Sequence, residues 1–300
     1  TESLDQGSYF DQDATDLSTD LRRETVLMLE EFGIPVESSH HEAAPSLQEI
    51  DLRHTDALTM ADTVMAYRLV VKEVAARHGC YATFMPKPIP DVNGNGMHIH
   101  QSLFQGDRNV FFDSGDPYQL SETARRFIAG LLHHAREITA VTNQWINSYK
   151  RLVPKFEAPT HVSWAMVNRS DLIRVPAYKS DREASRRIEY RAPDPACNPY
   201  LAFSVMLAAG LEGIENHYEL PPPVDTNVYE MSDEYRESRG IQSLPTNLWE
   251  AIQITQESDL VRRALGEHVF ASFIENKRIE WEKYHSQVSD YELKRYLPML

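Results

Sequence analysis

The chain has few cysteines, a shortage of basic residues and no long apolar run. Its two cysteines, Cys80 and Cys197, are too few and too far apart for a disulfide framework, which favours a reducing compartment such as the cytoplasm. They also supply no CxxC pair for structural zinc. The 45 acidic and 30 basic residues give a net charge of −15, which argues against a nucleic-acid partner.

No apolar stretch approaches the length of a membrane span, and the opening sequence TESLDQGSYF is too polar for the apolar part of a signal peptide. The first residue is not Met, which indicates a fragment of a longer protein. With 42% hydrophobic residues, the 300 residues can form one large domain or two smaller ones, each with a sizeable core. These features indicate a globular class.

Apolar periodicity and capping signals predict both helices and strands. Helices are expected over 21–32, 57–78, 121–139 and 199–217, and in a charged tail after the break PPPVD at 221–225. Strands are expected over 34–38, 97–103, 161–167 and 186–192, and a strand over 81–90 runs into a Pro-rich loop. The segment HHEAAPSLQEID is expected to be an irregular loop. Strands and helices that alternate but include short hairpins of antiparallel appearance favour an α+β fold over a doubly wound parallel sheet.

The stretch NGNGMHIHQS combines paired glycines with alternating polar residues. If it is extended, His98, His100 and Ser102 share one face, because side chains alternate along a strand. A half-buried strand with its polar face in water would give the same pattern. The glycines favour a binding site, since they let the backbone approach a ligand.

The stretch RRIEYRA repeats this alternation with charged residues. An exposed ladder of salt bridges is one interpretation. The alternative is a site for a polyanion, because guanidinium groups suit phosphate and carboxylate oxygens, with a metal bridging those oxygens to Glu189. The residues that favour the second interpretation in this acidic chain are Arg151, Arg169, Arg174, Arg187 and Arg191.

Two carboxylates, Glu42 and Glu49, lie seven residues apart next to the histidines at 40–41. Carboxylates in loops are commonly just solvated. These two could also add oxygen ligands to a site that contains His98 and Glu189. Carboxylates with one imidazole suit Mg²⁺ or Mn²⁺ better than structural zinc.

Taken in order, these motifs resemble the catalytic domain of type I glutamine synthetase, a glutamate–ammonia ligase. The motifs are GSYFD, HHEAAPSLQEID, ATFMPKPIPDVNGNGMHIHQSLF, NQWINSYKRLVPKFEAP, NRSDLIRVP and RRIEYRAPDPACNPYLAF, and they span nearly all 300 residues. The resemblance implies a glutamine synthetase/guanidino kinase-like fold, with a curved antiparallel sheet and flanking helices. It implies one catalytic domain over 1–300 that lacks its first strand or strands and the N-terminal β-grasp domain.

The resemblance implies an ATP-dependent reaction of nitrogen metabolism in two steps. The side-chain carboxylate of L-glutamate would take the γ-phosphoryl group, and ammonia would then displace phosphate from the γ-glutamyl phosphate to give glutamine. The implied cofactors are ATP and two or three Mg²⁺ or Mn²⁺ ions, which hold the reacting groups in line.

The resemblance also implies roles for individual residues. The implied metal ligands are Glu42 and Glu49 for one ion, and His98 and Glu189 for another. The implied glutamate-binding residues are Asn93, Gly94, Arg151 and Arg191, and the implied ATP-binding residues are His100, Ser102, Arg169, Arg174 and Arg187. Glu157 is the implied flap carboxylate, which shields the intermediate from water, and Tyr9 and Glu42 belong to the ammonium pocket. The implied catalytic residues are Glu157, Arg169 and Glu42.

Two departures from the family pattern are visible. An ExE strand and a β-domain upstream are absent, so this portion is expected to be incomplete alone. In PSLQE, relatives commonly have Gln and His before the second Glu, which affects the implied role of Glu49.

The implied assembly is a cytoplasmic homo-oligomer, a dodecamer with active sites at subunit interfaces and without a nucleic-acid or membrane partner. A second hypothesis keeps the chemistry but takes a polyamine or an alkylamine as acceptor. A third is a non-catalytic homologue. Tyr229 lies where some family members are adenylylated, although exposed loop tyrosines are common.

Overall fold

The structure is a computed structural model that describes residues 2–12, 17–168, 170–176, 183–224, 226 and 228–300. The helices are α1 (Leu17–Glu31), α2 (Ala57–Arg77), α3 (Glu122–His133), α4 (Ala135–Thr142), α5 (Ser148–Arg151), α6 (Pro199–Glu215), α7 (Asp233–Ser238), α8 (Leu248–Gln256), α9 (Asp259–Leu265), α10 (Glu267–His285) and α11 (Asp290–Tyr296), with 3₁₀ turns η1 (Glu183–Ser185) and η2 (Val228–Glu230). The strands are β1 (Val36–His41), β2 (Gln48–Leu52), β3 (Ile99–Gln101), β4 (Phe104–Gln105), β5 (Arg108–Asn109), β6 (Trp164–Ala165), β7 (Ile173–Arg174) and β8 (Ile188–Tyr190). In the part described, no helix is both long and apolar enough to cross a bilayer.

The strands form small sheets. The largest has the order β3-β8-β7-β6, and β1–β2 and β4–β5 form two hairpins. The α+β prediction is confirmed. The expected sheet is divided into pieces, and one of its pairs, β6–β7, is parallel rather than antiparallel. The strands of the four-stranded sheet are only two or three residues long. Most of each predicted strand is irregular backbone outside the sheet.

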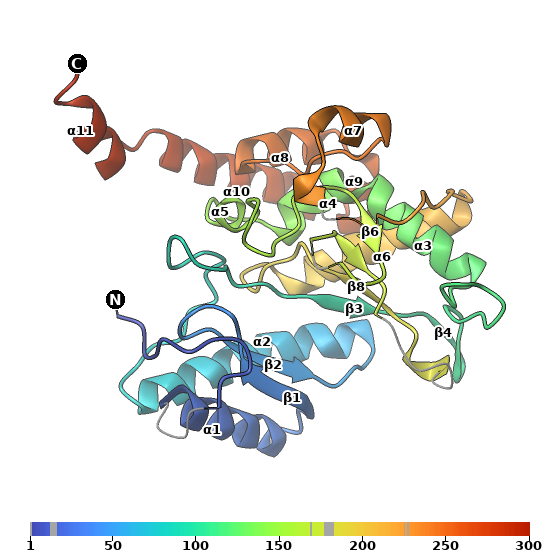
Figure 1. Ribbon diagram of the computed structural model, residues 1–300, viewed down its shortest axis with the longest axis horizontal. Helices are drawn as coiled ribbons and strands as arrows, with labels where there is room; N and C mark the ends of the chain where they lie inside the picture. Colours follow the sequence, from blue (N-terminus) through green and yellow to red (C-terminus); the bar gives the residue numbers. More distant parts are fainter. Residues whose placement is uncertain (1, 13–16, 169, 177–182, 225, 227) are drawn as a thin grey trace.

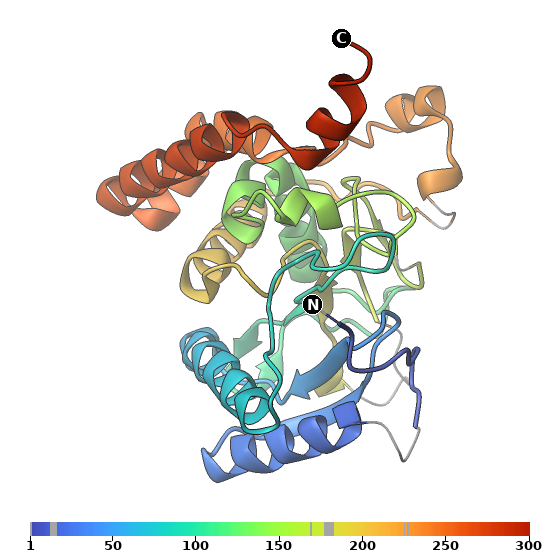
Figure 2. The same ribbon diagram turned by 90° about the vertical axis from the view of Figure 1, so that its left-hand side faces the viewer.

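Two lobes are visible in Figures 1 and 2, and α2 of the smaller lobe packs against α6 of the larger one. The smaller lobe contains α1, α2 and the β1–β2 hairpin around a core of Leu29, Ile34, Val70 and Val74. The larger lobe packs the helices from α3 to α10 around the four-stranded sheet, and α11 projects away from it. The site described below lies where side chains of the hairpin and of β3 interact.

Some predicted elements differ from the structure. The expected loop 40–51 is wrong in part, because His40 and Glu49 are paired across the β1–β2 hairpin. Residues 81–90, all of which the structure describes, do not form the expected strand. The prolines at 86, 88 and 90 lack the N–H groups that a strand ladder needs. The expected helix 121–139 is divided into α3 and α4 at His134, whose ring lies 3.0 Å from the Glu137 carboxylate.

Helices α3 and α6 cross at glycines. A Cβ added to Gly213 would lie 2.2 Å from the Arg126 carbonyl oxygen and 2.6 Å from the Gly130 Cα, and one added to Gly130 would lie 2.1 Å from the Ala209 carbonyl oxygen. Only glycine therefore permits this backbone contact. The crossing supports the core beneath the four-stranded sheet, because Phe127 of α3 also packs into it.

Gly213→Ala should destabilise the protein by about 1–3 kcal/mol, because the added methyl group overpacks the crossing. At an exposed helical position the same change would stabilise, by about 1 kcal/mol, so the sign is diagnostic. Chemical denaturation would measure the difference. Gly115→Ala in an exposed turn is the control, and an equal loss of stability there would contradict the explanation.

Candidate functional site

The β1–β2 hairpin brings together a histidine and two carboxylates. Its register pairs His40 with Glu49, and the Glu42 N–H donates to the Leu47 carbonyl at 2.8 Å, which closes the turn. The His40 Nε2 atom lies 3.6 Å from Glu42 Oε1 and 3.7 Å from Glu49 Oε2. Glu42 and Glu49, which were predicted to act together, are therefore neighbours.

The polar groups of this hairpin are crowded, and one of them lacks a hydrogen-bond partner among the described residues. Burial, with the carboxylates of Asp51 and Glu42, raises the pKa of Glu49 to about 8. His40 Nε2 is buried and has no hydrogen-bond partner among the described residues. Among the described residues, His40, Glu42 and Glu49 each offer one possible metal-ligand atom, and these three atoms lie within 4.8 Å of one another. The donor set fits a hard divalent cation such as Mg²⁺ or Mn²⁺.

A network behind the hairpin fixes its turn. Asp5 Oδ1 accepts hydrogen bonds from the backbone of Ser46 at 2.8 Å and of Gly7 at 3.0 Å, and it lies 2.9 Å from His41 Nε2. Ser46 has a φ of 58°, a conformation that needs such support in a residue with a side chain. A Cβ at position 7 would lie 2.5 Å from His41 Nε2, so glycine is required there. The network therefore supports the turn that connects Glu42 to Glu49.

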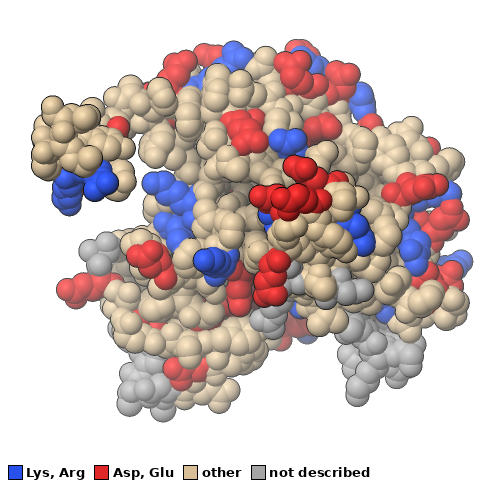
Figure 3. Space-filling model, turned by 45° about the horizontal axis from the view of Figure 1, so that its top comes forward, with Lys and Arg blue, Asp and Glu red and all other residues tan. Residues whose placement is uncertain are grey.

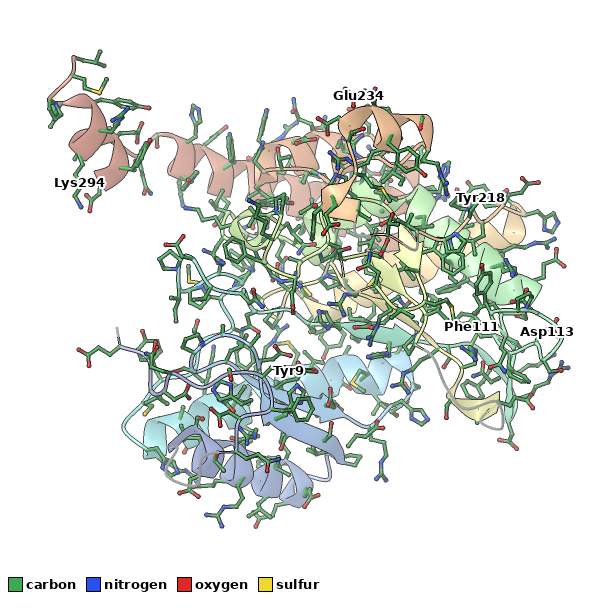
Figure 4. All side chains as sticks on the ribbon, viewed as in Figure 1. Tyr9, Phe111, Asp113, Tyr218, Glu234 and Lys294 are labelled. Carbon is green, nitrogen blue, oxygen red and sulfur yellow. The ribbon has the colours of Figure 1, made fainter. Side chains whose placement is uncertain are left out.

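Two aromatic rings cover His40. The Phe10 ring stacks on the imidazole with centroids 4.4 Å apart and an interplanar angle of 5°, and the Tyr9 ring meets it edge-on at 5.5 Å. Figure 4 shows Tyr9 beside the hairpin, between the two lobes. Tyr9 and Phe10 are 44% and 56% exposed, so their rings are accessible to a small molecule that reaches the carboxylates. The Tyr9 ring and the Glu42 carboxylate therefore both lie beside the His40 imidazole.

The opposite side of the site is built on β3, β8 and β7. Their register pairs His100 with Glu189, and Glu189 with Arg174. Residues directly opposite in a ladder share a face, so His100, Glu189 and Arg174 project together, while Ile99 packs against the core on the other side. The predicted alternation is confirmed over Ile99–Gln101, whereas His98 and Ser102 lie just outside β3.

Glu189 is the centre of this face and is only 2% exposed. Its carboxylate forms ion pairs with Arg174 and, at 2.6 Å, with Arg191 Nη1, and it lies 3.2 Å from His98 Nδ1. The predicted pair of His98 and Glu189 is therefore adjacent. Two guanidinium groups already neutralise Glu189, so it is a less available ligand than the crowded carboxylates of the hairpin.

Burial and the positive charges around them lower the pKa of His98, which precedes β3, and of His100 within it. Burial is the main cause for His98, followed by Arg191 and Arg151, and its pKa lies well below the ordinary value. Burial also lowers the pKa of His100 to about 4, although Glu189 opposes the shift. Both rings are therefore neutral at pH 7, the form that binds metals or accepts hydrogen bonds. The Asp51 carboxylate also acts on His100, which links the hairpin to β3.

Arg151 lies under the glycine-rich turn and is 3% exposed. Its guanidinium donates to the carbonyls of Ala192 at 2.6 Å and Arg191 at 3.1 Å. A Cβ at Gly94 would lie 2.9 Å from Arg151 Cγ. The predicted glutamate-binding residues are therefore packed together, but Arg151 already uses part of its donors to hold the backbone that follows β8.

The remaining predicted residues are distributed as follows. Glu157 is exposed, in the loop after α5, with a φ of 53°. Arg187 Nε donates to His100 Nδ1 at 3.0 Å, and Ser102 is half-buried one residue beyond β3. Asn93 is half-buried next to Gly94. The predicted residue Arg169 lies outside the described residues.

Tyr229 is a half-buried residue of η2 rather than an exposed loop residue. Its hydroxyl donates to the Ala158 carbonyl, next to Glu157. Burial raises its pKa, while Arg191 and Arg151 act in the opposite direction. Tyr229 therefore connects the base of the Glu157 loop with Arg151 and Arg191, whose charges act on its hydroxyl.

His40, Asp5 and Asp51 also belong to this site, although the sequence motifs did not indicate them. His40 had a usable signal, since in an extended chain it shares a face with Glu42 two residues later. Asp5 had none, because its role depends on a contact with Ser46, 41 residues away. On the face seen in Figure 3, acidic and basic side chains are interspersed over the surface.

Comparison with known proteins places this geometry in a family. A family model described as the catalytic domain of glutamine synthetase matches residues 1–296. Curated glutamine synthetases are similar over nearly the whole chain: that of Mycolicibacterium smegmatis is 55% identical over 298 residues, 99% of this chain and 67% of the relative. That of Mycobacterium tuberculosis is 53% identical over 296 residues, 99% of this chain and 66% of the relative. The chain thus spans about two thirds of the length of these relatives.

Solved structures give the same result. A complex of GmaS with ADP superposes with a TM-score of 0.88 and 33% identity, over 99% of this chain and 68% of the other. The glutamine synthetase of Plasmodium falciparum superposes with a TM-score of 0.84 and 28% identity, over 97% of this chain and 64% of the other. The expected fold is thereby confirmed.

Glu49→Gln should change stability in a pH-dependent way. Because folding raises the pKa of Glu49 from 4.5 to about 8, its contribution to stability is full below pH 4.5 and is lost as the pH rises through 8. In chelator, the wild type should lose melting temperature between pH 5 and 8 more steeply than the variant. At pH 8, Mn²⁺ should bind the variant at least about tenfold more weakly.

Thermal melts and Mn²⁺ titration by calorimetry would measure both effects. Glu37→Gln, an exposed change on the same hairpin, is the matched control and should behave as the wild type. Equal Mn²⁺ affinity in the Glu49→Gln variant and the wild type would contradict the assignment of this cluster as a cation site.

Proposed function

The chain belongs to the glutamine synthetase catalytic-domain family, and we propose that it carries the site at which ATP drives the ligation of ammonia to the side-chain carboxylate of L-glutamate. The observation that carries the proposal is the approach of two oppositely charged groups. Crowded carboxylates of the β1–β2 hairpin lie on one side, and arginines gathered around Glu189 lie on the other. The relatives named glutamine synthetase, at 53–55% identity, support this ligase activity.

The proposed cofactors are ATP and two or three Mg²⁺ or Mn²⁺ ions. His40, Glu42 and Glu49 would hold one ion, and the unpartnered His40 Nε2 and the raised pKa of Glu49 support that assignment. His98 and Glu189 would hold another ion. The neutral imidazole of His98 supports this assignment, although a cation there would have to compete with the guanidinium groups already paired with Glu189. Such ions supply charge neutralisation between the triphosphate and the attacking carboxylate.

The protein's own residues would orient the two substrates. His100 and Ser102 are proposed to face the nucleotide, and Arg174, Arg187 and Arg169 to stabilise the charge on the transferred phosphoryl group. GmaS, whose solved structure is similar to this chain, forms a complex with ADP, which supports the proposal that the chain binds a nucleotide.

Glutamate is proposed to bind between the Asn93–Gly94 turn and the buried arginines Arg151 and Arg191. Packing of the turn on Arg151 supports this position. Glu157 would close over the γ-glutamyl phosphate, exclude water and help remove a proton from the incoming ammonium, which Tyr9 and Glu42 would bind.

A second candidate keeps the chemistry and changes the acceptor to an alkylamine or polyamine. The exposed rings of Tyr9 and Phe10 beside His40 favour it, because aromatic faces bind alkylammonium groups. A non-catalytic homologue is less well supported, since the predicted ligand positions keep chemically competent residues.

We also propose that residues 1–300 form a single catalytic domain of a longer cytoplasmic protein, and that this protein assembles as a dodecamer with active sites shared between subunits. Similarity to the family supports an oligomer of identical chains. The mass of the intact protein in solution and the sequence of its N-terminus would test these points.

Kinetics with the intact protein would separate the candidates. ADP release that depends on both glutamate and ammonium is expected, with a higher kcat/KM for ammonium than for methylamine or putrescine. The reverse order would assign the organic amine. Absence of Mn²⁺-dependent ATP binding would favour the non-catalytic homologue.

Glu157→Gln should lower amide formation by about a hundredfold or more, because the carboxylate that accepts a proton is lost. ATP affinity should not change, since the residue lies in the exposed loop rather than on β3. Product analysis and ATP titration would measure the two effects. Glu275→Gln on α10 is the control, and wild-type amide formation by the Glu157→Gln variant would refute the assigned role.

A further inference from the structure

The glycine-rich turn is packed closely against the backbone of Pro86 and the side chain of Arg151 in α5. The Asn95 N–H donates to the Pro86 carbonyl at 2.7 Å, so residues 86–95 form a closed loop. A Cβ at Gly94 would lie 2.7 Å from that same carbonyl oxygen and 2.9 Å from Arg151 Cγ. The loop therefore has little freedom to shift relative to Arg151.

Lys87 is the residue through which this loop is attached. Its backbone N–H donates to Asn147 Oδ1 at 2.6 Å, and the Asn147 side-chain amide donates back to the Lys87 carbonyl at 3.0 Å. Both backbone polar groups of Lys87 are thus bound by one side chain, just before α5 begins at Ser148. This reciprocal pair sets the direction in which the Lys87 side chain leaves the backbone.

The Lys87 ammonium group contacts two other segments. It donates to the Val92 carbonyl, next to Asn93, and its Nζ atom lies 3.9 Å from the centre of the Phe156 ring. Burial lowers its pKa and the Asp91 carboxylate opposes that shift. A cation over an aromatic face is attracted by the ring quadrupole. One ammonium group therefore joins the glycine-rich turn to the loop that carries Glu157.

The Glu157 loop needs such an anchor. Lys155 and Glu157, which flank Phe156, have φ values of 79° and 53°. A residue with a side chain pays about 1–2 kcal/mol for this left-handed conformation, so the loop keeps it only where surrounding contacts hold it. Beyond Glu157, the Tyr229 hydroxyl binds the Ala158 carbonyl and holds the other end.

We infer that Lys87 is a positioning residue for the ligation reaction. By binding the Val92 carbonyl and the Phe156 ring together, it fixes the distance between the glutamate-binding turn and the carboxylate of Glu157. This inference rests on the proposed function, because it takes the roles of Asn93 and Glu157 from it. Loss of the Lys87 contact should let water reach the acyl phosphate before the amine does.

Hydrogen exchange of residues 152–160 tests the anchor without relying on activity. Lys87→Met and Phe156→Leu should each speed exchange of this segment by roughly 2–30-fold, which corresponds to the about 0.5–2 kcal/mol of a cation–π contact. Lys87→Arg should remain near the wild type, because a guanidinium also stacks on a ring. Unchanged exchange in Lys87→Met would overturn the inference.

The ratio of phosphate released to amide formed tests the positioning role. It should stay near the wild-type value in Lys87→Arg and rise several-fold in Lys87→Met and Phe156→Leu, and the double variant should show no further rise. Lys72→Met is the matched control, since Lys72 lies 5.9 Å from the Phe84 ring and outside the site. Its melting temperature and that of Lys87→Met would verify folding.

The outcomes separate the two proposals. If the wild type releases no glutamate-dependent phosphate, the proposed function fails, while the exchange measurement still decides whether Lys87 anchors the Glu157 loop. If exchange rises in Lys87→Met but the ratio of phosphate to amide does not, Lys87 is a structural anchor only and the positioning role is wrong.

Discussion

A buried carboxylate at the centre of the four-stranded sheet is the constraint on which the site depends. Glu189 is 2% exposed and is held by Arg174, Arg191 and His98. A buried charge is tolerated only when it is paired, so side chains of β7, of the residue after β8 and of the residue before β3 must converge on it. This convergence lines one wall of the site with guanidinium groups although the chain as a whole is strongly acidic.

The β1–β2 hairpin has the opposite imbalance. Burial, together with the carboxylates of Asp51 and Glu42, raises the pKa of Glu49 to about 8. Asp51 also acts on His100 of β3, so the carboxylates and the arginine-lined face influence each other across the boundary between the lobes. A protein can retain such opposing excesses where ligands of both signs, cations and polyanions, bind between them.

Rigid and strained backbone are distributed differently around the site. The sheet and α5 fix Glu189 and Arg151 through buried ion pairs and carbonyl contacts. The loop that carries Glu157 is exposed and contains two residues in the left-handed region. Strained, weakly packed segments are those that can change position when a substrate binds, whereas the residues that bind charge need a fixed place.

The sequence by itself determined the α+β class, the long helices α2 and α6, and the face shared by His98 and His100. These depend on local periodicity, on caps such as Asp56 and on strand alternation, which a short window contains. The motifs also fixed the family. They did so because their order along the chain is specific.

Only the tertiary structure decided which charges meet. The hairpin register that pairs His40 with Glu49, the support of its turn by Asp5, and the contact between Lys87 and Phe156 join residues that local patterns treat separately. The division of the sheet into short pieces had the same origin. Burial and pairing are properties of the packed chain, and the free energy of a charge depends on the neighbours that packing gives it.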